Sequence, residues 1–167
     1  MKRAIALLEK HNLLKIISDE LDINLEIPHI AYVEVKRPDS KAILFTNVVD
    51  RKNSKKFKEP VLMNVFCNED AVKLFIGDGD KIGSEIESLL KLKPPVTFSE
   101  KLSTLGKLFS LKNTIPKKIK GKGICQEVIK LGADAKLSDL PVLTTWENDA
   151  GPFITMGQVY TQSLNGE

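Results

Sequence analysis

The sequence has few of the residues from which metal sites and redox centres are built. Its 167 residues include only two cysteines and two histidines. Cys67 and Cys125 lie far apart, and no pair among these four residues has the C-x2-C or H-x3-H spacing of a zinc site. We therefore expect reduced thiols, as in an intracellular protein, and no metal site built from this chain.

The sequence also lacks long apolar runs and a strong charge of either sign. No run approaches the roughly 20 residues that a membrane-spanning helix needs. The first residues begin like a signal peptide, but the apolar stretch ends at Glu9 and no small-residue cleavage site follows. The net charge of +3, from 25 basic and 22 acidic residues, indicates solubility rather than a nucleic-acid partner. We expect a cytoplasmic protein with no membrane span.

The motifs of nucleophilic and phosphate-binding enzymes are missing as well. There is no G-x-S-x-G, no P-loop and no H-E-x-x-H. Gly77, Gly79 and Gly83 approach the dinucleotide pattern G-x-G-x-x-G, but the spacing is wrong, and a helix-capping turn is the better interpretation. The acidic residues after residue 133 have no histidine near them in sequence to complete a triad. We predict no catalytic residue in this chain.

The first half of the sequence is typical of an α/β domain. A helix is expected around residues 4–8, a strand at 13–17, and a second helix with Pro28 in its first turn. Continuous apolar runs at 42–45 and 60–66 predict buried strands, and the polar, lysine-rich residues between them, 48–59, predict a solvent loop.

Two further helices are expected after these strands. Asn68 is a candidate N-cap, followed by Glu69 and Asp70 at the positive end of the helix dipole. The next helix ends at Pro94 and Pro95, and Ser99 caps another.

Residues 101–122 are rich in lysine, and residues 101–126 contain no acidic residue. A solvated linker between two domains is the simplest interpretation. A nucleic-acid-binding module is an alternative that we rank lower, because the stretch has no arginine and no aromatic residues spaced for base stacking.

The residues after 123 are typical of β-structure. Short apolar pairs alternate there with glycine, proline and acidic residues. Residues 154–164 alternate loosely and predict one long strand, which ends at the hairpin-turn dipeptide formed by Asn165 and Gly166. Because no return strand follows, we expect the sequence to stop within a β-domain.

Residues 140–157, LPVLTTWENDAGPFITMG, resemble the UbiD family of aromatic-acid decarboxylases. The segments 42–45, 60–66, 94–95 and 125–126 also resemble family patterns, so the similarity covers essentially the whole chain. The sequence departs from common members at Glu147, Asn148 and Met156, which leaves the substrate class open.

The resemblance implies an N-terminal α/β domain over residues 1–118. Residues 119–167 would then be the first strands of a split β-barrel, similar to flavin reductases. It also implies a parent carboxy-lyase that removes carbon dioxide non-oxidatively from an aromatic acid. The implied substrate is a 3-polyprenyl-4-hydroxybenzoate or a naphthoate in quinone biosynthesis. The implied partners are a flavin prenyltransferase that supplies the cofactor and further copies of the same chain.

The implied cofactors are prenylated FMN, a divalent metal (Mn or Mg) and potassium. The family's Asn-x4-Arg motif and its remaining metal ligands would lie beyond residue 167. Thr155 is the one family cofactor contact within this chain, and its hydroxyl can donate to a flavin phosphate or ring carbonyl. We therefore expect the chain alone to be inactive. A non-catalytic interaction or assembly module is the alternative.

Overall fold

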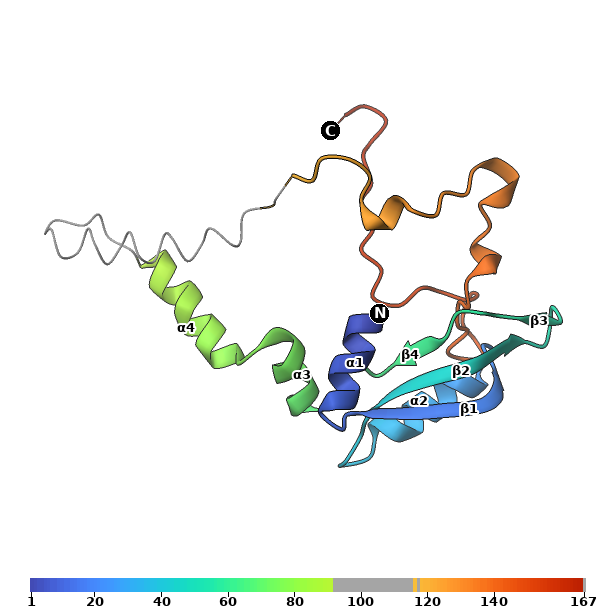
Figure 1. Ribbon diagram of the computed structural model, residues 1–167, viewed down its shortest axis with the longest axis horizontal. Helices are drawn as coiled ribbons and strands as arrows, with labels where there is room; N and C mark the ends of the chain where they lie inside the picture. The colour runs from blue at the N-terminus through green and yellow to red at the C-terminus, as the bar shows by residue number, and fades with distance from the viewer. Residues whose placement is uncertain (92–115, 117, 167) are drawn as a thin grey trace, which may run out of the picture. The chain divides into compact units, whose positions relative to one another are not determined.

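The computed structural model describes residues 1–91, 116 and 118–166. It divides into two compact units (Figure 1). One unit comprises Met1–Gly77 with Lys136–Glu167, and the other comprises Asp78–Ala135. The expected cap at Ser99, the helix stop at Pro94 and Pro95, and most of the lysine-rich stretch lie outside the described residues.

The first unit is built on a small mixed sheet. Strand β1 (Leu14–Asp22) runs parallel to β2 (Ala42–Asp50), and helix α2 (Glu26–Val35) lies between them in sequence. β2 also pairs antiparallel with β3 (Lys55–Lys56) and with β4 (Val61–Met63). Parallel neighbours need a crossover of this kind, so the first half forms a β-α-β unit as expected.

Two of the other helices described begin where the sequence provides a cap. α1 (Lys2–Lys10) has no side-chain cap, and it buries Leu8 completely. α3 (Glu69–Ile76) begins after Asn68, whose Oδ1 accepts from the Ala71 amide at 2.9 Å. In the second unit, α4 (Gly79–Leu90) begins after Asp78, whose carboxylate accepts from the Asp80 amide at 3.0 Å. Both predicted capping turns are confirmed.

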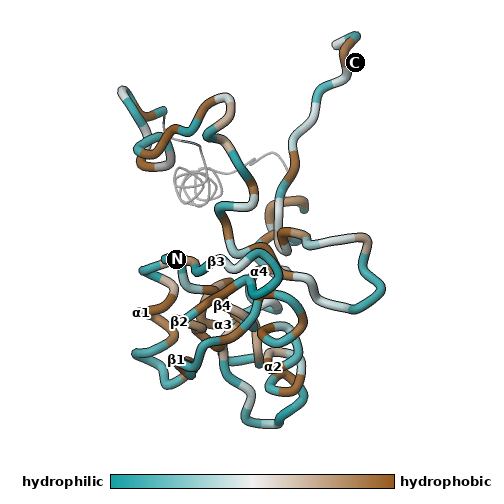
Figure 2. Tube along the Cα trace, turned by 90° about the vertical axis from the view of Figure 1, so that its right-hand side faces the viewer, coloured by the Kyte–Doolittle hydropathy of each residue, from teal (hydrophilic) through white to brown (hydrophobic). Residues whose placement is uncertain are grey.

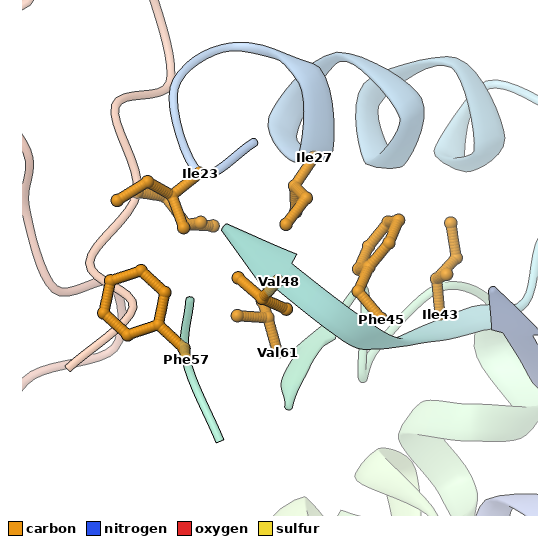
Figure 3. Packing of buried hydrophobic residues seen from close by; sticks show 8 residues of the cluster. Ile23, Ile27, Ile43, Phe45, Val48, Phe57 and Val61 are labelled. Carbon is orange, nitrogen blue, oxygen red and sulfur yellow. The ribbon is translucent and has the colours of Figure 1, made fainter. Parts of the chain in front are cut away.

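One cluster of apolar side chains forms the core of the first unit. Figure 3 shows Ile27 of α2 facing Ile43 and Phe45 of β2. The remaining buried members of the cluster are Ile23, Val48, Phe57, Val61 and Leu143. Leu143 comes from a distant part of the chain, so the core includes residues from both of the segments that make up this unit.

The solvent loop predicted for residues 48–59 is confirmed at residues 51–54 and 58–59, which are exposed and lie outside the strands, and is wrong for the other residues. β2 continues to Asp50 with Val48 and Val49 buried, and Phe57 is buried as well. The lysines of β3 keep their ammonium groups at the surface, while the phenyl ring of Phe57 packs in the core. The lysine-rich composition of this stretch therefore did not indicate a strand. The strand predicted at 60–66 is also shorter, because Asn64 adopts a positive φ of 55°.

The long strand predicted at 154–164 is absent. Thr155 and Met156 form a turn, and Met156 has a φ of 58°. Within the described part of residues 136–166, β-type pairing is limited to two isolated bridges, Asn24 with Thr144 and Leu143 with Phe153. A strand needs a hydrogen-bonding neighbour, and the chain as described provides none along this stretch. The split barrel is therefore not confirmed, and the domain boundary at residue 118 stays a prediction.

Short 3-10 helices take the place of expected β-structure between residues 124 and 139. They are η2 (Ile124–Gln126), η3 (Gly132–Asp134) and η4 (Leu137–Asp139). A turn forms near the predicted position, but one residue earlier, since the Gly166 amide donates to the Ser163 carbonyl at 3.1 Å and Leu164 and Asn165 are the central residues. No helix in the described ranges is long and apolar enough to cross a membrane.

The core predicts that alanine substitutions at two apolar residues of the sheet lower the free energy of unfolding by very different amounts. Phe45→Ala should lower the free energy of unfolding by about 3–5 kcal/mol, because the ring is fully buried. Ile16→Ala in β1 should cost about 1 kcal/mol or less, because that side chain is 56% exposed. Urea denaturation followed by circular dichroism measures both. Equal losses would contradict the assignment of the core.

Candidate functional site at the carboxyl end of the parallel strands

Residues 140–157 dock where β1 ends. The Thr144 amide donates to the Ile23 carbonyl at 3.2 Å, and the Leu25 amide donates to the Thr144 carbonyl at 3.1 Å. Leu143 is only 7% exposed, and its carbonyl accepts from the Phe153 amide. Figure 1 shows this segment beside the ends of β1 and β2. In α/β sheets, the carboxyl ends of parallel strands are where ligands bind, so this edge is the candidate site.

A network of charged residues fixes the β1–α2 junction at this edge. Arg51 Nη1 lies 2.6 Å from Glu26 Oε1, and Glu26 Oε2 accepts from the Asp22 amide at 2.8 Å. Asp22, which is 9% exposed, accepts in turn from the Asn24 amide at 3.0 Å. These bonds hold the connection in the shape that presents the Ile23 carbonyl and the Leu25 amide to Thr144.

The network also perturbs the titration of its members. The Arg51 guanidinium, through its hydrogen bond, holds the pKa of the Glu26 carboxyl below its ordinary value, and the Asp22 amide contributes in the same direction. The pKa of Arg51 is raised by the same partner. Glu26 therefore stays ionised at neutral pH and the junction keeps its ion pair.

A cavity of about 570 Å³ opens between α2 and the turn at residues 145–148. We call it the Trp146 cavity. Tyr32 and Trp146 form part of its wall in an edge-to-face arrangement, with ring centroids 5.5 Å apart and planes at 75°. Its lining residues are Leu25, Pro28, His29, Ala31, Tyr32, Val35, Met63, Asn64, Thr145, Trp146, Glu147 and Asn148. Such a mainly apolar cavity with a few polar groups is the usual form of a small-molecule site.

Local hydrogen bonds hold the walls of this cavity in place. Asn64 Nδ2 donates to the Ala31 carbonyl at 2.7 Å, which fixes the end of β4 against α2. The Trp146 amide donates to Asp149 Oδ2 at 2.8 Å, which closes the turn that carries the indole. Lys36 Nζ lies 5.0 Å from the Tyr32 ring centroid, a cation–π contact.

A second cavity, of about 450 Å³, lies between the β2–β3 turn and residues 137–154. Its apolar lining includes Phe57, Leu140 and Ile154. Lys55 Nζ anchors this side by donating to the Ser138 carbonyl and by pairing with Asp139 at 3.2 Å. Lys55 thus holds the residues that lead into the docked segment.

Thr155, the predicted cofactor contact, is exposed and lines neither cavity. The turn at Thr155 and Met156 breaks the strand alternation that the sequence predicted for this stretch. Cys67 is buried with a free thiol, and burial raises its pKa. In the described part of the chain, no three histidine, cysteine or acidic side chains gather closely enough to hold a metal ion.

Sequence reasoning missed His29 and Glu147, which line the same cavity although they are far apart in sequence. A signal was present in α2, whose apolar side chains are not confined to one face. Figure 2 shows brown residues along the whole helix, separated by its polar ones. Apolar side chains on more than one face are normally covered on more than one face. Tyr32, Val33 and Val35 are instead 46%, 53% and 41% exposed.

Two family models match the chain. The 3-octaprenyl-4-hydroxybenzoate carboxy-lyase N-terminal domain matches residues 5–90. The 3-octaprenyl-4-hydroxybenzoate carboxy-lyase Rift-related domain matches residues 117–167. The two matches follow one another along the chain and together include the residues that form the candidate site.

Curated relatives share the chain's sequence but are much longer. Proteins named only as uncharacterized, from two strains of Helicobacter pylori, are 41% identical over 170 residues, which is 99% of this chain and 27% of theirs. One from Aquifex aeolicus is 37% identical over 158 residues, 93% of this chain and 31% of its own. The chain thus spans between a quarter and a third of the length of these relatives.

The junction network predicts a pH-dependent contribution to stability. The folded pKa of Glu26 is depressed, so its contribution is present above the ordinary glutamate pKa and is lost as pH falls through the folded value. Glu26→Gln should therefore lower the unfolding free energy at pH 7 by up to about 1 kcal/mol, since the pair is solvent-exposed. At acidic pH the variant and the wild type should converge.

Thermal denaturation at several pH values tests this, with Glu59→Gln as the control, an exposed glutamate outside the network. A Glu26→Gln deficit that does not change with pH would show that the ion pair is not its source.

Proposed function

The chain belongs to the UbiD family, and on this premise we propose that it forms the first part of a carboxy-lyase that removes carbon dioxide from an aromatic acid. The observation that carries the proposal is the consecutive match to two domains of one enzyme family, over residues 5–90 and 117–167. In this proposal the α/β unit is the base on which residues 140–157 are positioned for the rest of the enzyme.

The proposed substrate is a 3-polyprenyl-4-hydroxybenzoate or a naphthoate in quinone biosynthesis. The names of both family models support the first of these, because they describe an octaprenyl-hydroxybenzoate carboxy-lyase. Glu147 and Asn148 depart from common family members and both line the Trp146 cavity. We therefore place substrate selection partly at this turn.

The described residues fit the proposed cofactor in part. Prenylated FMN, when bound, supplies the electron sink that lets the bond to the departing carboxyl group break. Thr155 is exposed, so its hydroxyl is accessible to donate one hydrogen bond to the flavin. The described residues contain no group of three histidine, cysteine or acidic side chains that could hold the divalent metal, and the resemblance places the ligands of both ions beyond residue 167. We assign those ions to other parts of the protein.

The role that remains for this chain's residues is positional. Leu143 in the core and Thr144 on the β1–α2 junction fix the start of the segment that leads to Thr155. Positioning of this kind matters because a misplacement of about 1 Å at a reacting centre can cost about a hundredfold in rate. Homo-oligomerisation, a flavin prenyltransferase as supplier and a cytoplasmic location belong to the same proposal.

A non-catalytic assembly module is the second candidate. The observation in its favour is the exposure of large apolar side chains near the end of the chain, with Val159, Tyr160 and Leu164 all above 80%. Exposed apolar residues in such numbers indicate surface that another polypeptide covers. The same exposure is expected if these residues pack against the remainder of an enzyme, so activity measurements decide between the candidates.

The 167-residue chain alone should not turn over an aromatic acid, even with prenylated FMN, Mn²⁺ and K⁺ supplied. The reason is that the family's Asn-x4-Arg motif and its remaining metal ligands would lie beyond residue 167. Release of carbon dioxide from 4-hydroxybenzoates and naphthoates measures this. A form extended to the length of the curated relatives is the positive control and should be active. Absence of activity in a folded, cofactor-loaded extended form would favour the assembly module.

Thr155→Val in the extended form should weaken flavin binding. The change keeps the shape of the side chain and removes the hydroxyl, so the expected loss is about threefold for a neutral partner and up to about 100-fold for a charged one. Flavin absorbance per subunit after desalting measures retention. Thr161→Val, another exposed threonine, is the matched control and should retain flavin fully. Equal retention in both variants would remove Thr155 from the site.

A further inference from the structure

The Trp146 cavity has a lining that suits a hydrocarbon better than it suits a carboxylate. Leu25, Pro28, Val35 and Met63 contribute aliphatic or thioether surface, and two aromatic rings add to it. The polar lining residues are His29, Asn64, Thr145, Glu147 and Asn148. Methionine side chains adapt to irregular apolar partners, and aromatic faces accept flat apolar groups. The binding free energy available here comes from burying apolar surface.

The charges around the cavity argue against the acidic end of an aromatic acid. Among the described residues that line it, His29 is the one basic side chain, there is no lysine or arginine, and the carboxylate of Glu147 is present. Lys36 lies nearby but stands over the Tyr32 ring. A ligand carboxylate brought here would face another carboxylate without a lysine or arginine to pair with, which is unfavourable at short range.

We propose that the Trp146 cavity binds part of the isoprenoid tail of a prenylated aromatic acid. This inference rests on the proposed function and deepens it, because it assigns the tail and the reacting head of one substrate to different sites. The octaprenyl group in the names of both family models is a long, uncharged hydrocarbon with flat branched units. A cavity of about 570 Å³ is large enough for several such units.

The exposure of the cavity's aromatic residues supports the same assignment. Trp146 is 56% exposed and Tyr32 is 46% exposed, although the turn and the helix that carry them are hydrogen-bonded in place. The rings are therefore held at the surface instead of turning inward. An apolar segment that lies along them would remove both from water, and the open side would let a longer tail continue outwards.

Trp146 is the only tryptophan in the chain, so its fluorescence reports on this cavity alone. The experiment titrates the 167-residue chain with geraniol, a short uncharged prenyl alcohol, and separately with 4-hydroxybenzoate, the head without a tail. Geraniol should give a saturable blue shift of the emission because the indole loses contact with water. The head group at the same concentration should give none.

Two variants of one helix locate the binding. Val35→Glu places a charge in the cavity lining and should weaken geraniol binding by about tenfold or more, because burying an unpaired carboxylate is costly. Val33→Glu makes the same change on α2 at a residue that does not line the cavity, and should leave the affinity unchanged. Both valines are exposed, so both variants should fold, and circular dichroism checks this.

Three results would overturn the inference. The first is an emission unchanged by geraniol. The second is equal weakening in both variants. The third is a blue shift that appears without ligand as protein concentration rises, accompanied by a dimer in gel filtration, which would identify a second copy as the occupant. Failure of the proposed function can be distinguished from failure of this inference. Geraniol binding does not require catalysis, and decarboxylation of an unprenylated acid by the extended form would stand without geraniol binding.

Discussion

The burial of Leu143 in one cluster with side chains from the first 61 residues is the contact on which the arrangement of the site depends. Other members of the cluster include Ile23, Phe57 and Val61, which come from the end of β1 and from the β3 and β4 segments. Burying one leucine contributes roughly 1.5–3 kcal/mol, which exceeds a single exposed ion pair. The two backbone hydrogen bonds of Thr144 then give this hydrophobic contact a fixed register.

That register determines where the aromatic wall of the site lies. Once Thr144 is paired with Asn24, the next turn places Trp146 edge-to-face with Tyr32 of α2. The Arg51–Glu26 pair acts one step earlier, because it shapes the junction that Thr144 pairs with. Junction electrostatics therefore shapes the surface on which residues 143 and 144 dock, and the shape of the cavity follows from that docking.

The proposals give different roles to the buried core and to the exposed apolar residues of the molecule. The buried sheet and its helices supply a stable base, while the residues after 143 leave much of their apolar surface exposed. An assembly that covers this apolar surface would be stabilised, because the surface is removed from water. A buried core that includes Leu143, followed by a segment with exposed apolar residues, is the arrangement on which both proposals rest.

The sequence by itself determined those features that depend on local chemistry. Asn68 and Asp78 were predictable as caps because a side-chain oxygen meets unsatisfied amides wherever a helix begins. The buried strand at 42–45 was predictable because it is apolar without interruption. The family was evident from residues 140–157, since that block is specific regardless of how it folds.

Tertiary structure alone decided the features that depend on a neighbour. The lysine-rich segment with Phe57 became part of the sheet because β2 was beside it, and residues 154–164 did not form a strand because the described chain offers them no pairing partner. His29 and Glu147 came together because Leu143 found its place in the core. Hydrogen-bond pairing and burial are relations between distant residues, and a linear pattern does not contain the distance between them.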